Sequence, residues 1–221
     1  NSEFTKKVVE KNILKNKGFV LHPPIDIDNL ISSQKEKLIL SVARFGSPSH
    51  PKRQDILIEA FRDFSSLVSG YKLILAGGVV EDGEMIESIK KQVGDLNIEI
   101  VTNPDFNSLR IVYGKAQVCG QAAGFDVDEE KNPDKVEHFG MTTVEAMASG
   151  AIPLVIAKGG QKEILSSFPE LLCNSAAQIA NNTAKLTKDI SAQTLLVNKL
   201  FSTAKQYSQS VFSDKISELI R

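Results

Sequence analysis

The chain has little cysteine, no tryptophan and no excess of charge of one sign. Its 26 Lys and Arg residues nearly balance 27 Asp and Glu residues, which gives a formal net charge of -1. A balanced chain carries no global electrostatic footprint for nucleic acid or for an anionic membrane. No apolar run approaches the roughly 18 residues of a bilayer-spanning helix. The N-terminal residues also lack the pattern of a signal peptide, which is a positively charged segment followed by an apolar stretch. We therefore expect a cytoplasmic protein with no nucleic-acid partner and no transmembrane segment.

The cysteines and histidines do not have the spacing of a metal site. Cys119 and Cys173 lack a CxxC arrangement and lie in apolar segments, which indicates reduced, buried, structural thiols. His22 and His50 have no partner at metal-ligand spacing. His138 follows Glu137 directly, so it is either a structural residue or a member of a functional site. We predict no metal site.

Two nucleotide-binding motifs are also absent. No GxGxxG follows the first predicted strand, and no GxxxxGK followed by Ser or Thr occurs anywhere in the chain. Their absence argues against dinucleotide oxidoreductases and P-loop enzymes.

From Lys37 onward, short apolar runs alternate with segments of helical period. Apolar, β-branched runs predict strands at 37–45, 71–78, 98–103, 117–123 and 151–157. Segments with one apolar face predict helices at 52–68, 83–96, 106–116 and 141–149. Near-continuous apolar strands need burial on both faces. The pattern therefore predicts an α/β domain over 37–174, a doubly wound parallel sheet of Rossmann-like type.

The two ends of the chain do not follow this alternation. Residues 1–36 contain an amphipathic stretch, a turn at Lys17 and Gly18, a short apolar strand over 19–21 and then two prolines, which is typical of a linker. Residues 175–221 contain two helical patterns and no clear strand. We expect these C-terminal helices to pack on the sheet domain.

Ligands of open parallel sheets bind outside the carboxyl ends of the strands, so the loops at those ends carry the candidate site. The first such loop holds Arg44 at a strand end, and Lys52 and Arg53 at the start of the next helix. Cations at a strand end and at a helix N-terminus suit a diphosphate. A solvated charge cluster is the alternative interpretation.

The segment VEHFGMTTVEAMASGAIPLVIAKGG contains the second part of the candidate site. Gly140 permits a turn close to a ligand, and the N–H groups of Met141 and Thr142 begin a helix there, so we expect anion binding. Glu145 lies one turn into that helix, where a carboxylate can accept two hydrogen bonds from a vicinal diol such as ribose. Glu137, on the preceding loop, can reach past the phosphates toward a sugar. Alternatively, either glutamate only complements the helix dipole at the surface.

Two further segments are weaker candidates. Gly159 and Gly160 precede a predicted helix, which indicates either a close backbone approach to the site or a plain turn. The acidic stretch 126–135 is predicted to be a solvent-exposed loop, with closure over the site as the alternative.

One segment resembles the signature of group 1 retaining glycosyltransferases of the GT-B fold. It consists of Glu137, seven intervening residues, and Glu145 as the first residue of EAMASGAIPLV, with two glycines after it. The resemblance extends from the Arg44 loop through the LILAGG strand to Gly160. The sequence EHFGMTTVEAMASGAIPL is similar to that of mannosyltransferases that use GDP-mannose in lipid-linked oligosaccharide or polysaccharide assembly. The resemblance implies that the chain is the donor-binding, C-terminal half of such an enzyme.

For the donor diphosphate, the resemblance implies that Arg44 and Lys52 bind it and that the backbone from Gly140 to Thr142 caps it. The spacing from Arg44 to Lys52 is longer than in many members, so Arg53 is an alternative to Lys52. Transfer in this family is retaining and needs no metal, and the leaving phosphate is commonly proposed to take the acceptor proton. The resemblance therefore implies Arg44, Lys52 and Glu137 as catalytic residues, through electrostatic stabilisation of the developing charge.

For the rest of the donor, the resemblance assigns three contacts. Glu145 holds the ribose hydroxyls, Glu137 contacts the transferred hexose near the reacting centre, and the loop from Val101 to Asn103 borders the base. The implied donor is a nucleotide sugar such as GDP-mannose or a UDP-sugar, which is a substrate, with no further cofactor.

The resemblance also implies what surrounds this domain. Residues 1–36 resemble the last strand and helix of the family's N-terminal domain, followed by the interdomain linker. An acceptor glycan or lipid-linked glycan would bind mostly on the missing half, which could also hold the enzyme at a membrane surface. We therefore expect this chain to bind a donor and to transfer no sugar by itself. The alternatives are another GT-B protein, such as a nucleotide-sugar epimerase, and a noncatalytic flavodoxin-like binding module.

Overall fold

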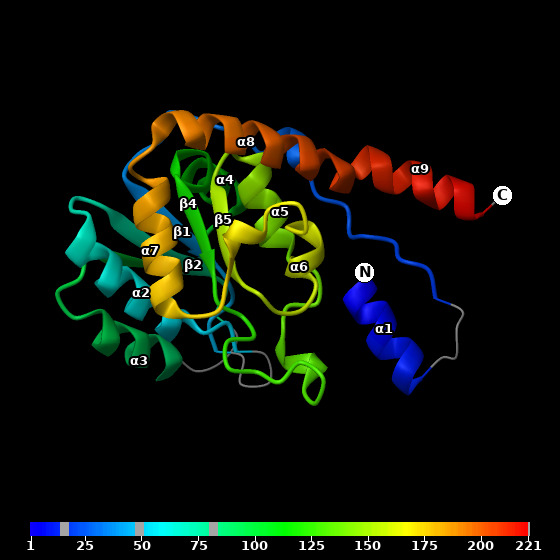
Figure 1. The fold of residues 1–221 in the computed structure, drawn as a ribbon, viewed down its shortest axis with the longest axis horizontal. Helices are drawn as coiled ribbons and strands as arrows, with labels where there is room; N and C mark the ends of the chain where they lie inside the picture. Colours follow the sequence, from blue (N-terminus) through cyan, green and yellow to red (C-terminus); the bar gives the residue numbers. More distant parts are fainter. Residues whose placement is uncertain (14–17, 47–50, 80–83, 221) are drawn as a thin grey trace.

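The sheet has the strand order of a doubly wound fold (Figure 1). The computed structural model describes residues 1–13, 18–46, 51–79 and 84–220, and within these ranges six parallel strands pair in the order β3-β2-β1-β4-β5-β6. The strands are β1 (Leu38–Val42), β2 (Lys72–Gly77), β3 (Ile98–Thr102), β4 (Val118–Gln121), β5 (Ile152–Ile156) and β6 (Leu172–Cys173). The order reverses between β1 and β4, so their carboxyl ends flank the crevice in which such sheets bind ligands. The predicted fold class and the predicted strands from residue 37 onward are confirmed.

Helices cover both faces of this sheet (Figure 1). In the described ranges the α-helices are α1 (Glu3–Asn12), α2 (Gln54–Leu67), α3 (Glu84–Val93), α4 (Phe106–Lys115), α5 (Met141–Ala148), α6 (Gln161–Ile164), α7 (Ala176–Leu186), α8 (Ile190–Ala204) and α9 (Gln209–Leu219). The 3₁₀ helices are η1 (Ile27–Asn29), η2 (Pro133–Lys135), η3 (Pro169–Leu171) and η4 (Lys205–Tyr207). The α2 helix packs against α3 and α7, and α5 packs against α8. The helices predicted between residues 52 and 149 therefore correspond to α2, α3, α4 and α5.

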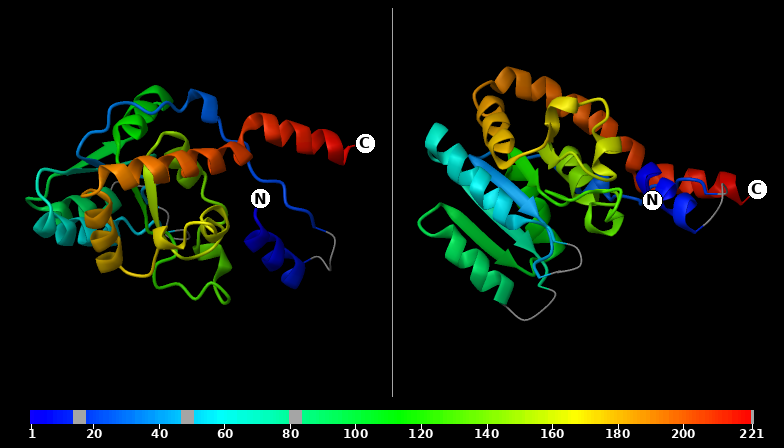
Figure 2. Two further views of the ribbon diagram at one scale, coloured as in Figure 1. Left: turned by 45° about the horizontal axis from the view of Figure 1, so that its top comes forward. Right: turned by 60° about the horizontal axis from the view of Figure 1, so that its bottom comes forward.

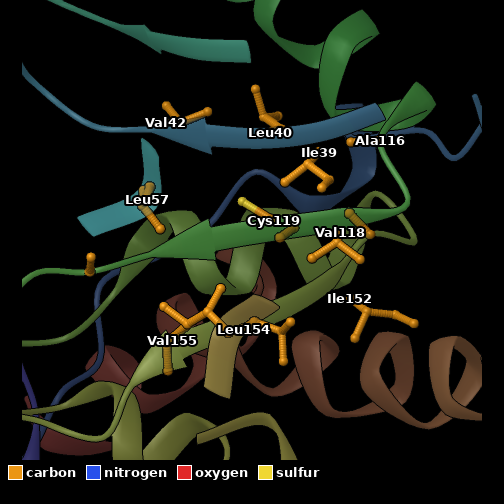
Figure 3. Packing of buried hydrophobic residues seen from close by; sticks show 14 of the residues in the cluster. Ile39, Leu40, Val42, Leu57, Ala116, Val118, Cys119, Ile152, Leu154 and Val155 are labelled. Carbon is orange, nitrogen blue, oxygen red and sulfur yellow. The ribbon is translucent and has the colours of Figure 1, made fainter. Parts of the chain in front are cut away.

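The central strands are buried along their whole length because helices lie over both faces. Every residue of β1, β4 and β5 is buried. Ile39, Val118 and Leu154 are among the side chains that fill the space between these strands and the neighbouring helices (Figure 3). Removing such a side chain from water contributes about 1.5–3 kcal/mol. The predicted apolar face of α2 is likewise buried at Ile56, Leu57, Ala60, Phe61 and Phe64.

Three features near the chain ends differ from the prediction. The predicted strand over 19–21 is wrong: these residues form no strand, and Phe19 is 65% exposed. The predicted turn lies partly outside the described residues, since Lys17 is not among them. The two-residue strand β6 was not predicted because it is too short to show an apolar period. The C-terminal part contains three α-helices, α7, α8 and α9, where two helical patterns were expected.

The segments at the two ends meet each other beside the sheet. Ile25 is buried and its N–H donates to the carbonyl of Tyr207, which joins the segment after α1 to η4. Ser33 donates from its backbone N–H to the carbonyl of Gly114 at the end of α4. Beyond η4, none of the described residues of α9 is buried, and the helix extends away from the sheet (Figure 2).

Candidate functional site

A cavity of about 560 Å³ opens at the carboxyl ends of β1, β2 and β4. Its size is in the range of cavities that hold a small organic ligand. The residues that line it come from five separate parts of the chain: Val42, Ala43, Arg44, Lys52, Gly77, Gly78, Asn103, Pro104, Leu109, Gln121, Glu137, Met141 and Thr142. The crevice at the strand ends is therefore hollow, and Arg44, Lys52 and Glu137 are the charged residues of a mostly apolar lining.

A second cavity of about 260 Å³ adjoins the first. The two cavities share the side chains of Arg44, Lys52, Glu137 and Met141. Its other lining residues come from the chain start and from the loop around Gly140: Asn1, Pro23, His138, Phe139 and Gly140. Two cations and one carboxylate thus stand where the two spaces meet.

Lys52 and Glu137 form an ion pair at this junction. The Nζ of Lys52 donates to Oε2 of Glu137 over 2.8 Å, and the two side chains are 11% and 26% exposed. Arg44, by contrast, is exposed, and its backbone carbonyl accepts a hydrogen bond from Gln54 Nε2 over 3.0 Å. The structure therefore brings the predicted residues together, but Lys52 and Glu137 contact each other rather than standing apart.

Arg53, the alternative to Lys52, points elsewhere. Its guanidinium binds the carboxylate of Asp55 and donates to the carbonyl of Phe125, and it lies 5.1 Å from the centre of the Phe125 ring. The hydrogen bond to Asp55 raises the pKa of Arg53. Arg53 lines neither of the two cavities. The geometry places Lys52, and not Arg53, in the candidate site.

The N-terminus of α5 opens toward the cavity. Gly140 precedes the helix with a φ of 110°, in the region that favours glycine, and no side chain caps the helix. A Cβ on Gly140 would lie 3.0 Å from Cγ of Gln161 and 3.2 Å from Oγ1 of Thr143. Met141 and Thr142, which begin the helix, line the cavity. First-turn amides and the positive end of the helix dipole therefore face the space beside Arg44.

Glu145 lies one turn further along α5 and is held by Tyr113. The Tyr113 hydroxyl donates to Oε2 of Glu145 over 2.8 Å, and Tyr113 is only 1% exposed. Burial raises the pKa of Glu145, and the hydrogen bond from Tyr113 lowers it in part. The neighbours Val144, Ala146 and Met147 are fully buried, as expected. Glu145 is not among the lining residues, and Tyr113 was not predicted because it lies in an apolar helix face.

The far end of the cavity is formed by residues that follow β3. Asn103 has a φ of 50°, its N–H donates to the carbonyl of Gly77 over 2.8 Å, and its Oδ1 accepts from the N–H of Val79 over 3.0 Å. Pro104 and Leu109 complete this end of the lining. Val101 lines neither cavity and packs against the core, whereas Asn103 of the same predicted loop lines the larger cavity.

The glycine pair after β5 lies against the loop of Glu137. Gly160 donates its N–H to the carbonyl of Glu137 over 2.8 Å, and Gly159 donates to Oε2 of Glu129 over 2.7 Å. A Cβ on Gly159 would lie 2.1 Å from the carbonyl oxygen of Glu137. The acidic stretch is therefore not a purely solvated loop, because Glu129 turns toward Gly159 and Lys162.

The chain start also contacts this loop, which was not predicted. The Oγ of Ser2 donates to the carbonyl of His138 over 2.5 Å. The first two amides of α1, from Glu3 and Phe4, donate to the carboxylate of Glu163 over 2.8 and 2.5 Å. These contacts join residues more than a hundred positions apart, so no local pattern could have signalled them.

His138 lines the smaller cavity, and His22 packs on Phe139, which lines it too. Nε2 of His138 lies 3.2 Å from the carbonyl of Pro133. The His22 ring stacks on Phe139 at 5.5 Å and meets the edge of Tyr207 at 5.2 Å. Burial lowers the pKa of His22. Both rings hold the backbone next to Glu137 against other segments.

A family comparison decides what kind of domain carries this cavity. The family model described as "Glycosyl transferases group 1" matches residues 23–193, which is most of the chain. The chain belongs to this family. It is a group 1 glycosyltransferase domain of α/β Rossmann-like fold.

Relatives of known name and structure agree with this membership. The chain is 23% identical over 218 residues to a "GDP-Man:Man(3)GlcNAc(2)-PP-Dol alpha-1,2-mannosyltransferase" of Dictyostelium discoideum, covering 92% of this chain and 42% of that protein. The chain thus spans less than half of that relative's length. Anabaena HepE, crystallised with UDP and glucose, superposes with a TM-score of 0.80 at 16% identity, covering 100% of this chain and 61% of HepE.

A third match covers almost the whole of a solved domain. It is the C-terminal domain of LpcC, a glycosyl transferase group 1 family protein from Francisella tularensis. The TM-score is 0.64 at 16% identity, and the match covers 84% of this chain and 99% of that domain. Likenesses at such identities show the fold alone. The family model favours a glycosyltransferase domain over a flavodoxin-like binding module.

Neither a metal cluster nor a bilayer-spanning helix is found in the part of the chain that the structure describes. No group of three or more His, Cys, Asp or Glu residues in those ranges is placed to hold a metal ion. His50 lies outside the described residues. No helix within the same ranges is long and apolar enough to cross a membrane.

Proposed function

We propose that the chain binds a nucleotide sugar in the 560 Å³ cavity and forms the donor half of a retaining hexosyltransferase. One observation carries the proposal. Arg44, Lys52 and the first residues of α5 line the same cavity. Two cations and a helix N-terminus that share one space fit a diphosphate better than any neutral ligand.

Lining residues at one end of the cavity, and Glu145 outside its lining, fit the remaining parts of such a ligand. Apolar and amide groups of Asn103, Pro104 and Leu109 suit a nucleobase. Glu145, with its carboxylate fixed by the Tyr113 hydroxyl, is one helical turn behind the diphosphate and suits the ribose diol. This order leaves the hexose at Glu137 and in the smaller cavity beside it.

In this arrangement the diphosphate is the leaving group. The acceptor hydroxyl attacks the anomeric carbon on the face from which the diphosphate departs, and its proton goes to the leaving phosphate oxygen. Negative charge grows on that oxygen as the glycosidic bond breaks, and positive charge grows on the sugar. Arg44, Lys52 and the α5 amides stabilise the first charge, and Glu137 stabilises the second. Such preorganised charges are usually the largest catalytic contribution.

The named relatives favour a mannosyl donor and a glycan acceptor. The Dictyostelium relative is named for GDP-mannose and a dolichol-linked glycan, whereas the HepE structure contains UDP and glucose. We propose GDP-mannose as the donor, with a UDP-sugar as the competing outcome, and no further cofactor. The acceptor glycan, lipid-linked in this proposal, would bind outside this chain, on a half that could rest on a membrane surface.

The same proposal divides the chain into three parts. Residues 1–36 join the donor domain to the rest of the enzyme, 37–174 form the donor domain, and 175–221 are the C-terminal helices. A solved C-terminal domain of a family member, of which the match covers 99%, supports this division.

Calorimetric titration with GDP, UDP, ADP and GDP-mannose tests the proposal. We expect binding of at least one diphosphate, with the guanine nucleotides tightest, and no turnover without a separate acceptor half. Absence of binding by all four ligands would contradict the donor-site assignment. Preference for UDP would retain the site and change the donor.

A further inference from the structure

The acidic loop 126–135 is an ordered structure. Oδ1 of Asp128 accepts hydrogen bonds from the N–H groups of Glu130 and Lys131 over 3.2 and 3.3 Å, and Asn132 donates its N–H to the Asp128 carbonyl over 2.9 Å. At its end, the Pro133 carbonyl lies 3.2 Å from the His138 ring. The loop therefore has a fixed shape and a fixed position next to the residue after Glu137.

One carboxylate of this loop turns inward. The side chain of Glu129 is 21% exposed, whereas that of Lys131, two residues later, is 81% exposed. Oε2 of Glu129 accepts the N–H of Gly159 over 2.7 Å, and Oε1 accepts from Nζ of Lys162 over 2.5 Å. Although burial opposes the ionised form, the contacts with Lys162 and Gly159 lower the pKa of Glu129 overall. Glu129 is thus held as an anion against the glycine pair.

The glycine pair lies between Glu129 and the backbone of Glu137. The Gly159 N–H points to Glu129, and the next N–H, of Gly160, points to the Glu137 carbonyl over 2.8 Å. A Cβ on Gly160 would lie 2.3 Å from the carbonyl of His138, so the two backbone segments are in direct contact. Any displacement of the glycine pair must therefore displace the backbone that carries the Glu137 side chain.

We propose that Glu129 is a positioning residue for Glu137, and that it acts through Gly159 and Gly160. The inference rests on the proposed function, in which Glu137 contacts the transferred sugar. Among the residues that the structure describes, Glu129 is not one of those that line either cavity. Its effect should therefore fall on the rate of transfer and not on donor binding, because a misplacement of about 1 Å at a reacting centre costs up to roughly 100-fold in rate.

The test compares four variants of the complete enzyme. Glu129→Ala removes both contacts, and we expect kcat to fall between about tenfold and 100-fold with the donor Kd unchanged. Glu129→Gln keeps an oxygen for the Gly159 N–H and should recover most of the rate. Lys162→Met removes only the ion pair and should have a small effect. Lys131→Ala, on the exposed side of the same loop, is the matched control and should leave kcat unchanged.

A second measurement reports the contact without any turnover. Hydrogen exchange of the peptides that contain Gly159, Gly160 and the Glu137 loop should speed up in Glu129→Ala and not in Lys131→Ala. An unchanged kcat in Glu129→Ala, or an equal loss in Lys131→Ala, would overturn the positioning role. If the parent itself binds no nucleoside diphosphate, the donor-site proposal fails instead, and the exchange result remains a separate outcome. If Glu129→Ala does not fold, the rate of Glu129→Gln decides. We expect Glu129→Gln to keep most of the parent's kcat, and a loss of kcat as large as that in Glu137→Gln would overturn the proposal.

Discussion

Nζ of Lys52 donates a 2.8 Å hydrogen bond to Oε2 of Glu137 at the junction of the two cavities. In the proposed complex, Lys52 binds the diphosphate and Glu137 faces the sugar, so the ion pair lies beside the bond that breaks. A cation and an anion held together in a partly buried place stabilise charges of both signs that develop there. Because the two side chains are paired, a neutral substitution at either residue leaves the charge of the other without its partner.

Lys52→Ala should weaken nucleoside diphosphate binding by about 1.5 to 3 kcal/mol, because it removes a charge-assisted contact. The loss should be enhanced because Glu137 is left unpaired beside the phosphates. Arg53→Ala is the matched control: its loss of contacts to Asp55 and Phe125 should lower the melting temperature without changing the Kd. Calorimetry and thermal melts on both variants separate the two. The opposite pattern would place Arg53 in the site.

Glu137→Gln should lower kcat by about 100-fold or more, by analogy with removal of one preorganised electrostatic contact. Binding of the free nucleoside diphosphate should not weaken, since Lys52 then carries no competing carboxylate. In the double variant Lys52→Ala with Glu137→Gln, the diphosphate Kd should recover part of the loss seen in Lys52→Ala. Simple additivity of the two changes in binding free energy would show that the residues do not act as a pair.

Tyr113→Phe should shift the pH dependence of donor binding. Burial raises the pKa of Glu145 and the Tyr113 hydroxyl lowers it in part, so removal of the hydroxyl raises that pKa further. If the ionised carboxylate binds the ribose diol, donor affinity is lost as pH falls through this pKa, and the loss should begin at a higher pH in Tyr113→Phe. Donor KM measured across the acid range, with kcat alongside, reports the shift. If the pH at which donor affinity is lost is the same in Tyr113→Phe and in the parent, Glu145 does not bind the donor as proposed.

Gly159→Ala should destabilise the fold far more than Gly94→Ala. Both glycines have a positive φ, 64° and 53°, so both variants pay the strain of a left-handed alanine, roughly 1–2 kcal/mol. Only at Gly159 would the new Cβ meet backbone, 2.1 Å from the Glu137 carbonyl oxygen, whereas nothing lies within 4 Å of one at Gly94. Chemical denaturation of the two variants measures the difference. Equal losses would show that the glycine pair has room to move away from Glu137.

The sheet and the helices that cover it could be predicted because burial on both faces leaves continuous apolar runs such as Ile152–Ile156. The start of α5 could be predicted because only a glycine fits the φ of 110° at Gly140. At the C-terminus, Ser208 accepts a hydrogen bond from the N–H of Val211 and caps α9. This serine is a local signal for a third helix, where only two helical patterns were predicted.

The contacts inside the site could not be predicted in the same way. Tyr113 with Glu145, and Glu129 with Gly159, join residues about thirty positions apart, and their meeting depends on how the strands are ordered. The ion pair of Lys52 with Glu137 depends on the same order. Sequence pattern identified the residue types of the site, whereas topology determines which of them contact each other.

An amide-detected NMR titration of this chain with GDP and UDP tests the donor-site assignment most directly. The account predicts that the backbone amide signals of Met141, Thr142, Arg44 and Lys52 show the largest chemical-shift changes. In Lys52→Ala these changes should be largely lost. Shifts confined to a surface away from α5, or unchanged shifts in Lys52→Ala, would contradict the claim that this cavity holds the diphosphate.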